Sequence, residues 1–203
     1  MLRVALTGGI ATGKTYVLDR FRALGIPCLD ADALVHGIEA AGTEATALIA
    51  ARFGADVLGG DGSVNRAKLG PIVFADPAAR RDLEAIIHPA VFRAIEAGIR
   101  GFELSGNYPF TVVDVPLLYE TGAERRYDKV IVTISPPEMQ IARLTARGLT
   151  DAAARQRIAA QWPTADKAAR ADYVVRTDGT FADTDRQVDE IHRALAARGS
   201  RPA

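Results

Sequence analysis

Short apolar runs alternate along the chain with longer segments that carry apolar residues at helical spacing. This alternation is typical of an α/β fold built on a parallel sheet. Apolar positions also repeat every three or four residues over 17–24 and over 188–195, which predicts an amphipathic helix at each place. The predicted strands are residues 2–6, 27–29, 110–115, 129–134 and 172–175.

The segment between the second and third predicted strands, residues 30–109, is too long for one crossover helix. It contains several helical patterns, so we predict a mostly helical insertion, about residues 31–108, within one domain that spans residues 1–203. A second polar helical stretch, residues 143–171, is rich in Arg and Ala. The terminal residues 198–203 are expected to be disordered.

Composition and charge narrow the class of protein. The 203 residues carry 25 basic and 25 acidic side chains, so no overall field favours binding to nucleic acid or to an anionic membrane. No window approaches the roughly 18–20 apolar residues of a membrane span, and the first residues predict a strand instead of a signal segment. We expect a soluble, cytoplasmic protein. Cys28 is the only cysteine, which excludes a disulfide framework, and its apolar neighbours predict a buried strand residue.

Residues 8–15, GGIATGKT, match the phosphate-binding pattern G-x-x-x-x-G-K-[ST] between a predicted strand and a predicted helix. Glycines such as Gly8 and Gly13 allow backbone N–H groups to surround phosphate oxygens at the start of the helix. The Lys14 ammonium would neutralise the β and γ phosphates, and the Thr15 hydroxyl would be a ligand of Mg²⁺. A chance match is the alternative, but the flanking strand and helix favour a nucleoside triphosphate site.

The rest of the chain narrows the kind of nucleotide-binding protein. A switch GTPase needs a base-reading N-K-x-D sequence, which is absent. Motor ATPases usually carry an acidic pair at the end of an apolar strand, where this chain has Asp114 alone. A small-molecule kinase remains. We keep open an ATP-binding module without turnover, and a kinase that acts on shikimate, gluconate or a nucleoside monophosphate.

A kinase needs a carboxylate beside the acceptor hydroxyl, and Asp30 and Asp32 follow the second predicted strand. The carboxyl ends of parallel strands form the edge at which sites converge. In an extended backbone, residues i and i+2 point the same way, so one carboxylate could face the acceptor and the other metal-bound water. The alternative is that one of them caps the helix that follows.

Three further side chains are candidates on the acceptor side. Asp114 ends a predicted strand and would reach the same edge of the sheet. Glu120 follows it in DVPLLYE and could contact the acceptor or be a solvated carboxylate. His88 precedes Pro89, which we expect to begin a new helix, and a structural role is the alternative for this histidine.

Arg143 and Arg147 are four residues apart, so we expect them to share one face of a helix. Arginines that close over the phosphates would stabilise spreading charge in the transition state and exclude water. A solvated charged helix face is the alternative, and it is favoured more strongly for Arg155 and Arg157.

Together these motifs resemble the dephospho-CoA kinase family. LTGGIATGKT, the DAD at 30–32, the H-P pair of LEAIIHP, DVPLLYE, MQIARLTAR, RIAAQ and ARADYVVRTDG follow the family's order over residues 2 to about 190. The resemblance implies a P-loop kinase three-layer sandwich with a five-stranded parallel core sheet, a helical acceptor-binding insertion and a lid over about residues 143–171. It implies transfer of the ATP γ-phosphate to the ribose 3′-hydroxyl of dephospho-CoA, giving coenzyme A and ADP with Mg²⁺.

We expect a monomer or weak homo-oligomer that binds neither nucleic acid nor membrane. The resemblance also implies roles for individual residues. The catalytic residues would be Asp32 as the base, with Lys14, Arg143 and Arg147. Contacts with ATP are implied for Gly8, Ala11, Thr12, Gly13, Lys14, Thr15, Tyr16, Thr177 and Gly179, with Thr15 also on the metal. Contacts with the acceptor are implied for Asp30, Asp32, His88, Asp114, Leu117 and Glu120.

The phosphate-binding loop departs from the family's usual sequence at Ala11 and Thr12, where a glycine and a serine are common. An alanine side chain disfavours positive φ, so we expect Ala11 to have a negative φ. Arg176 stands where the family often has an acidic or amide residue.

Overall fold

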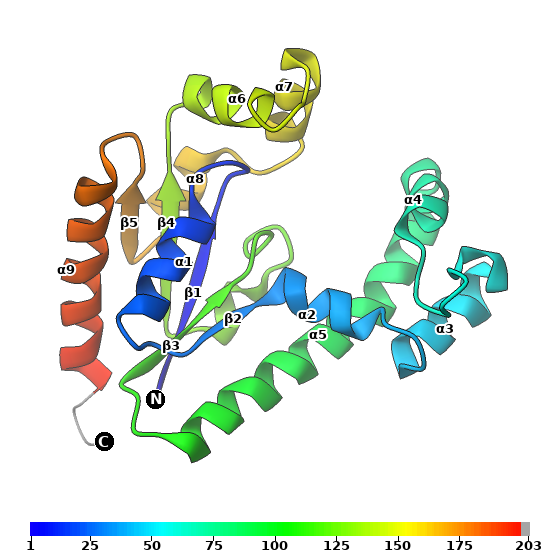
Figure 1. Ribbon diagram of the computed structural model, residues 1–203, viewed down its shortest axis with the longest axis horizontal. Coiled ribbons are helices and arrows are strands. Elements are labelled where there is room, and N and C mark those ends of the chain that lie inside the picture. Colours follow the sequence, from blue (N-terminus) through cyan, green and yellow to red (C-terminus); the bar gives the residue numbers. More distant parts are fainter. Residues whose placement is uncertain (200–203) are drawn as a thin grey trace. The chain divides into compact units, whose positions relative to one another are not determined.

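The computed structural model describes residues 1–199 (Figure 1). Residues 200–203, which complete the predicted disordered tail, lie outside the described residues. The prediction is wrong for Arg198 and Gly199, because these two residues end the last helix, α9 (Phe181–Gly199).

A five-stranded sheet forms the centre of the fold, and the predicted strands are confirmed. The strands are β1 (Leu2–Gly8), β2 (Cys28–Asp30), β3 (Phe110–Asp114), β4 (Lys129–Ile134) and β5 (Tyr173–Arg176), in the order β2-β3-β1-β4-β5. β1 pairs in parallel with β3 on one side and β4 on the other, and β4 pairs in parallel with β5. The strand that precedes the glycine loop is therefore central, with both of its edges hydrogen-bonded.

Two helices cover one face of this sheet, α1 (Lys14–Ala23) and α9 (Figure 1). Their apolar sides contribute Phe21 and Leu195 to a core with Val4, Leu6 and Ile131, and each of these side chains is fully buried. Alternate strand residues such as Ala5, Val113 and Val132 point to the opposite face and are also buried. Burial on both faces explains why the strands read as continuous apolar runs.

The remaining helices of the carboxyl-terminal half follow β4. They are α6 (Pro137–Thr145), α7 (Asp151–Ala159) and α8 (Thr164–Ala169), and a short 3-10 turn, η2 (Ala123–Arg126), precedes β4. Leu144 of α6 and Ala154 of α7 are buried against each other and against Ala11 of the glycine loop.

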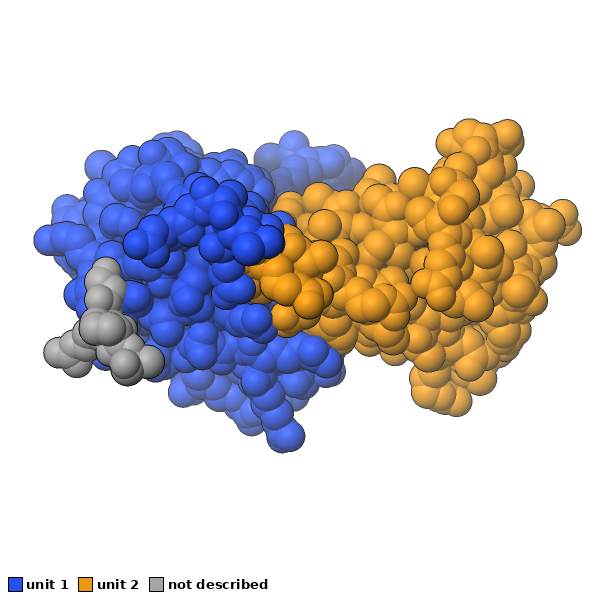
Figure 2. Space-filling model, turned by 90° about the horizontal axis from the view of Figure 1, so that it is seen from below, with its two compact units in different colours: residues 1–29, 101–203 blue, residues 30–100 orange. Residues whose placement is uncertain are grey.

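The chain divides into two compact units, residues 1–29 with 101–203, and residues 30–100 (Figure 2). The second unit is mostly helical, as its apolar spacing predicts. It contains α2 (Ala31–Ile38), α3 (Glu44–Phe53), the 3-10 turn η1 (Ala55–Val57), α4 (Arg66–Ala75) and most of α5 (Pro77–Ser105).

The helix α5 continues through Pro89, so the prediction that this proline begins a new helix is wrong. Proline inside a helix leaves one carbonyl without its N–H partner and costs about 3 kcal/mol or more. An apolar stripe of Ile87, Val91, Ile95 and Ile99 is buried along α5, and its burial offsets that cost.

In residues 1–199, no helix combines the length and apolar character that crossing a membrane requires.

Candidate active site

The glycine loop connects β1 directly to α1, with Gly13 as the residue before the helix. Gly13 has φ 86 and ψ 18, a left-handed conformation that favours glycine, and it offers no side chain to cap the helix. The first turn of α1 contains no acidic residue. Its N–H groups lack intrahelical acceptors, and the positive end of the helix dipole lies there, so the loop is suited to an anion.

Two further glycines are required by close approaches. A Cβ at Gly8 would lie 2.6 Å from the carbonyl oxygen of Thr133, and one at Gly9 would lie 2.6 Å from the Thr164 hydroxyl oxygen. Both distances are too short for non-bonded atoms, so β4 and α8 could not pack this closely on any larger residue.

Thr12 stabilises the loop from inside. Its fully buried hydroxyl donates to the Gly9 carbonyl at 2.7 Å and lies 2.7 Å from the Thr133 hydroxyl. The Thr177 hydroxyl donates to the Thr12 carbonyl at 2.9 Å. The side chain of Thr12 therefore faces the protein interior, and its N–H and carbonyl groups are also hydrogen-bonded within the protein.

Ala11 has φ 59, so the expectation of a negative φ at this residue is wrong. The left-handed conformation costs an alanine about 1–2 kcal/mol. Two observations explain why it persists: the methyl group is buried beside Leu144 and Ala154, and the Ala11 carbonyl accepts a hydrogen bond from Arg143 at 3.0 Å.

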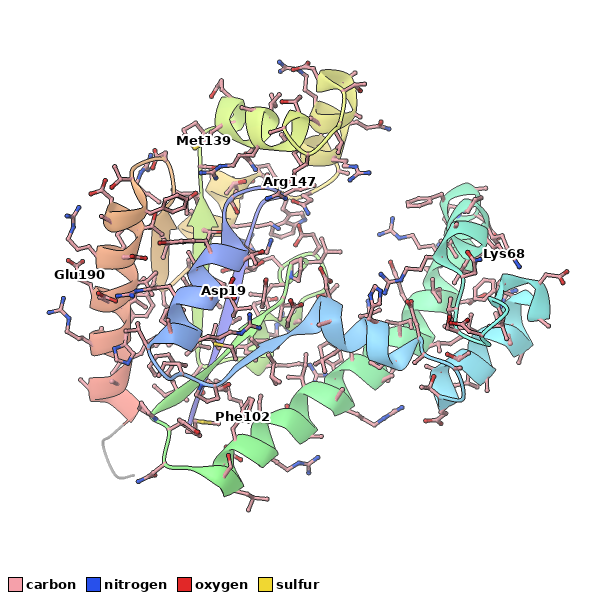
Figure 3. All side chains as sticks on the ribbon, viewed as in Figure 1. Asp19, Lys68, Phe102, Met139, Arg147 and Glu190 are labelled. Atoms are coloured by element: carbon pink, nitrogen blue, oxygen red, sulfur yellow. The ribbon has the colours of Figure 1, made fainter. Side chains whose placement is uncertain are left out.

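Arg143 connects the glycine loop to the segment after β5. Its Nη1 donates to Ala11 and to the Thr177 hydroxyl at 3.1 Å, and its Nη2 donates to the Thr177 carbonyl at 2.6 Å. Arg147, labelled in Figure 3, lies beyond the end of α6 and is exposed. The expectation that both arginines share one helix face is therefore wrong. Arg155 pairs with Asp151 at 2.6 Å on the surface of α7, consistent with the solvated alternative.

Two glutamines that the sequence did not single out hold the loop residue Ile10 from both sides. Gln140 Nε2 donates to the Ile10 carbonyl at 2.7 Å, and the Ile10 N–H donates to Gln161 Oε1 at 2.8 Å. Both glutamines belong to segments that carry the family resemblance, MQIARLTAR and RIAAQ, and these segments could have identified them as candidates. The contacts span more than 120 residues of sequence, so spacing alone could not assign them.

Lys14 and Thr15 are the exception in this stabilised loop. Neither the Lys14 ammonium nor the Thr15 hydroxyl has a hydrogen bond or ion pair with any of residues 1–199. The same residues contain no group of three or more His, Cys, Asp or Glu side chains arranged for a metal ion. The Thr15 hydroxyl is an oxygen donor of the kind that Mg²⁺ accepts as a ligand.

The nucleotide-side residues beyond the loop have their own contacts. The Tyr16 hydroxyl donates to Asp185 at 2.8 Å, and this hydrogen bond raises the pKa of the phenol. The Tyr16 ring lies 4.7 Å from the ring of Phe181, centroid to centroid. Gly179 is exposed in the turn between Thr177 and α9.

On the acceptor side, three candidates follow or end β3 in the first unit. Asp114 is its last residue and is 7% exposed. Leu117 is an exposed apolar residue. Glu120 is not solvated: its Oε1 is 2.6 Å from the ammonium of Lys167, a residue that the sequence analysis did not select.

The other candidates lie in the second unit. Asp30 caps α2, with its Oδ1 accepting the Ala33 N–H at 3.1 Å, so the capping alternative holds for this residue. Asp32 is exposed in the first helical turn and lines a cavity of about 310 Å³ with Arg66 and Leu69. Because the chain becomes helical after Asp30, the expectation of two carboxylates on one extended strand is wrong. His88 is partly buried in the middle of α5.

The glycine loop joins the central strand of a parallel sheet to a helix that presents the Lys14 ammonium and the Thr15 hydroxyl. This arrangement defines a P-loop nucleotide-binding protein. The family model of dephospho-CoA kinase matches residues 2–183. The chain belongs to the dephospho-CoA kinase family, and its activity is that of a dephospho-CoA kinase, with ATP as the phosphoryl donor. The resemblance stated from the motifs is thereby confirmed.

Individual relatives agree with this assignment. A dephospho-CoA kinase from Anaeromyxobacter dehalogenans is 49% identical over 177 residues, which covers 87% of this chain and 83% of the relative. A crystal structure from Thermus thermophilus has a TM-score of 0.83 at 30% identity, covering 96% of this chain and 97% of the other. The dephospho-CoA kinase of Campylobacter jejuni has a TM-score of 0.72 at 25% identity, with the same coverage.

Proposed function

We propose that this dephospho-CoA kinase holds the phosphates of ATP on residues 8–15 and uses Asp32 to accept the proton of the ribose 3′-hydroxyl. The observation that carries the proposal is the contrast within the loop. Ile10, Ala11 and Thr12 are held by contacts inside the protein, whereas the Lys14 ammonium and the Thr15 hydroxyl have no hydrogen bond or ion pair with any of residues 1–199.

On the donor side, the loop supplies positive charge where the γ-phosphoryl group develops negative charge. The N–H groups of the first turn of α1 and the Lys14 ammonium would contact the phosphate oxygens. Because contacts with Gln140, Gln161 and Arg143 fix the loop, little rearrangement accompanies the reaction, and preorganised donors of this kind are the most effective.

A magnesium ion is part of the proposal, with the Thr15 hydroxyl as its protein ligand. When bound, such an ion would supply positive charge that stabilises the phosphate groups. The residue's own contribution is an exposed hydroxyl at the first turn of α1 that no other group of residues 1–199 engages.

On the acceptor side, Asp32 is the proposed base and Asp30 the residue that orients it. Asp32 is exposed and lines a cavity, so its carboxylate is accessible to a ligand. The capping bond of Asp30 uses one carboxylate oxygen and fixes the start of α2, the helix that carries Asp32. We assign acceptor contacts also to His88, Asp114 and Leu117.

We propose a single kinase domain over residues 1–203, with an acceptor-binding insertion at about 31–108 and a lid at about 143–171. Arg143 and Arg147 begin the proposed lid. Arg147 is exposed and has no ion pair with any of residues 1–199, which leaves its guanidinium available to phosphate oxygens. A cytoplasmic location and a monomeric or weakly associating state stay predictions.

The first experiment measures ADP release by the purified protein with ATP and Mg²⁺, with dephospho-CoA, shikimate, gluconate or AMP as the acceptor. We expect turnover with dephospho-CoA alone and coenzyme A as the product. Omission of Mg²⁺ should remove the turnover. Turnover with another acceptor would contradict the assignment of the acceptor.

The assignment of the base is tested with Asp32→Asn, and Asp56→Asn, an exposed residue of the same unit, is the control. The first variant should bind ATP as the wild type does and lose about 10²–10⁴-fold in rate, the usual contribution of a general base. Wild-type turnover in Asp32→Asn would exclude Asp32 as the base.

A further inference from the structure

The ammonium group of Lys167 contacts Pro116 and Glu120, which belong to the loop after β3, and the mechanism above does not use it. Its side chain is 0% exposed, with Nζ 2.6 Å from Glu120 Oε1 and 3.5 Å from the carbonyl oxygen of Pro116. Lysine is almost never fully buried unless it is paired, because its charge loses hydration. The carboxylate of Glu120 compensates that loss.

Further contacts attach the acceptor-side loop, residues 116–120, to the segment that carries Lys167. Glu120 Oε1 accepts the Trp162 N–H at 3.2 Å. The ring of Tyr119 stacks on the ring of Trp162, with centroids 6.2 Å apart and planes 5° from parallel. These contacts fix the loop that follows Asp114 and presents the exposed side chain of Leu117.

The same segment also contacts the phosphate-binding loop. Gln161 Oε1 accepts the Ile10 N–H at 2.8 Å, and the Thr164 hydroxyl lies against Gly9, where it leaves no room for a Cβ. The Thr7 hydroxyl, at the end of β1, donates to the Pro116 carbonyl at 3.2 Å. Residues 161–167 therefore contact the donor loop after β1 and the acceptor-side loop after β3.

We propose that Lys167 is a positioning residue for the acceptor. Its ion pair with Glu120 sets the place of residues 116–120 relative to the phosphate-binding loop, so that the acceptor hydroxyl meets the γ-phosphate in line. A displacement of about 1 Å can cost an enzyme about 10²-fold in rate. The proposal rests on the proposed function, since it requires that residues 114–120 contact the acceptor.

The test compares Lys167→Met with the double variant Lys167→Met/Glu120→Gln. The single variant leaves a buried carboxylate unpaired and should be strongly destabilised, whereas the double variant removes both charges at similar volume and should recover most of the stability. In the double variant we expect the KM for dephospho-CoA to rise about tenfold and kcat to fall. The KM for ATP should stay within about twofold of the wild-type value, because Gln161 and Arg143 still hold the phosphate-binding loop.

The matched control is Lys129→Met/Asp172→Asn, which removes another lysine–carboxylate pair with a 2.6 Å contact, at the start of β4. Its kinetic constants should equal those of the wild type. Amide hydrogen exchange gives a readout that needs no turnover: exchange over residues 116–122 should be faster in the Lys167→Met/Glu120→Gln variant, and exchange over residues 9–15 should be unaltered.

A stable double variant with the wild-type KM for dephospho-CoA would overturn the proposal and leave the pair with a structural role alone. An equal rise in both KM values, or unaltered exchange over 116–122, would overturn it too. Failure of the proposed function is a separate result, because wild-type protein that ignores dephospho-CoA would reveal it before any variant is made.

Discussion

Arg143 donates to the carbonyl oxygen of Thr177 at 2.6 Å and thereby joins α6 to the segment after β5. A second nitrogen of the same guanidinium donates to Ala11 in the phosphate-binding loop. One planar side chain with several donors thus fixes two segments that are 166 residues apart in sequence, Ala11 and Thr177. Lysine lacks this geometry.

Arg143→Lys should therefore weaken the donor side more than the acceptor side. The variant loses two or three of the hydrogen bonds that the Arg143 guanidinium donates, and each contributes about 1.5–3 kcal/mol. We therefore expect kcat/KM for ATP to fall at least about tenfold. The KM for dephospho-CoA should change by less than about twofold. Steady-state kinetics with each substrate varied in turn measures both, and Arg155→Lys on the surface of α7 is the control. A rise in the KM for dephospho-CoA alone would assign Arg143 to the acceptor pocket.

Lys14→Ala tests the charge of the phosphate-binding loop. Because the ammonium has no partner in residues 1–199, its removal should leave thermal unfolding close to that of the wild type. Turnover should fall by about 10²–10³-fold or more, the cost of removing one preorganised donor to a charged transition state. The two readouts are ADP release and the unfolding temperature. Unchanged turnover would contradict the assignment of this loop.

The sheet and the phosphate-binding loop were predictable because their signals are local. Strands buried on both faces give short apolar runs, and the glycine loop has a fixed spacing between a strand and a helix. The end of α6 after Arg143 was also predictable from a nearby glycine, although the four-residue spacing of Arg143 and Arg147 suggested a continuous helix. Gly148 has φ 91 and follows the last turn of α6, as glycine commonly does, so Arg147 could not stay on the helix.

The remaining features depend on contacts between residues far apart in sequence. The positive φ of Ala11 is stabilised by a hydrogen bond from Arg143, and α5 continues through Pro89 because apolar burial outweighs the local cost. The partner of Glu120 is 47 residues later, at Lys167. The residues around Glu120 in the sequence do not indicate this partner, so a solvated carboxylate was an equally good interpretation of Glu120.

Ala11→Gly tests the strain in the loop. Glycine removes the left-handed penalty of about 1–2 kcal/mol, but the change loses a buried methyl group worth about 0.8 kcal/mol and adds entropy to the unfolded chain. These contributions nearly cancel, so the free energy of unfolding should change by less than about 1 kcal/mol. Ala154→Gly, in the same apolar cluster but inside α7, should lose about 2 kcal/mol, from the methyl group and helix propensity together. Equal losses in the two variants, measured by denaturant unfolding, would contradict the positive φ at Ala11.

Cys28 provides a test of stability against pH. Burial raises the pKa of its thiol from 9.0 to about 12, although the side chain is only partly buried in β2 and its Sγ lies 3.3 Å from the Ile26 carbonyl. Above pH 9 the thiol ionises in the unfolded chain and stays protonated in the folded protein. The unfolded state then binds fewer protons, so the free energy of unfolding falls as pH rises through the window from 9 to about 12.

Each pH unit in that window should cost up to about 1.4 kcal/mol from this one group. The comparison with Cys28→Ala isolates it, because all other side chains titrate alike in the two proteins. Denaturant unfolding at pH 8, 9 and 10 should therefore show the wild type losing stability faster than the alanine variant above pH 9, with parallel behaviour below it. Parallel curves over the whole range would mean that the thiol ionises as readily in the folded protein as in the unfolded chain. Alkylation by iodoacetamide at pH 9 should also be slower in the folded protein than after unfolding, because folding lowers both the thiolate fraction and the access to Cys28.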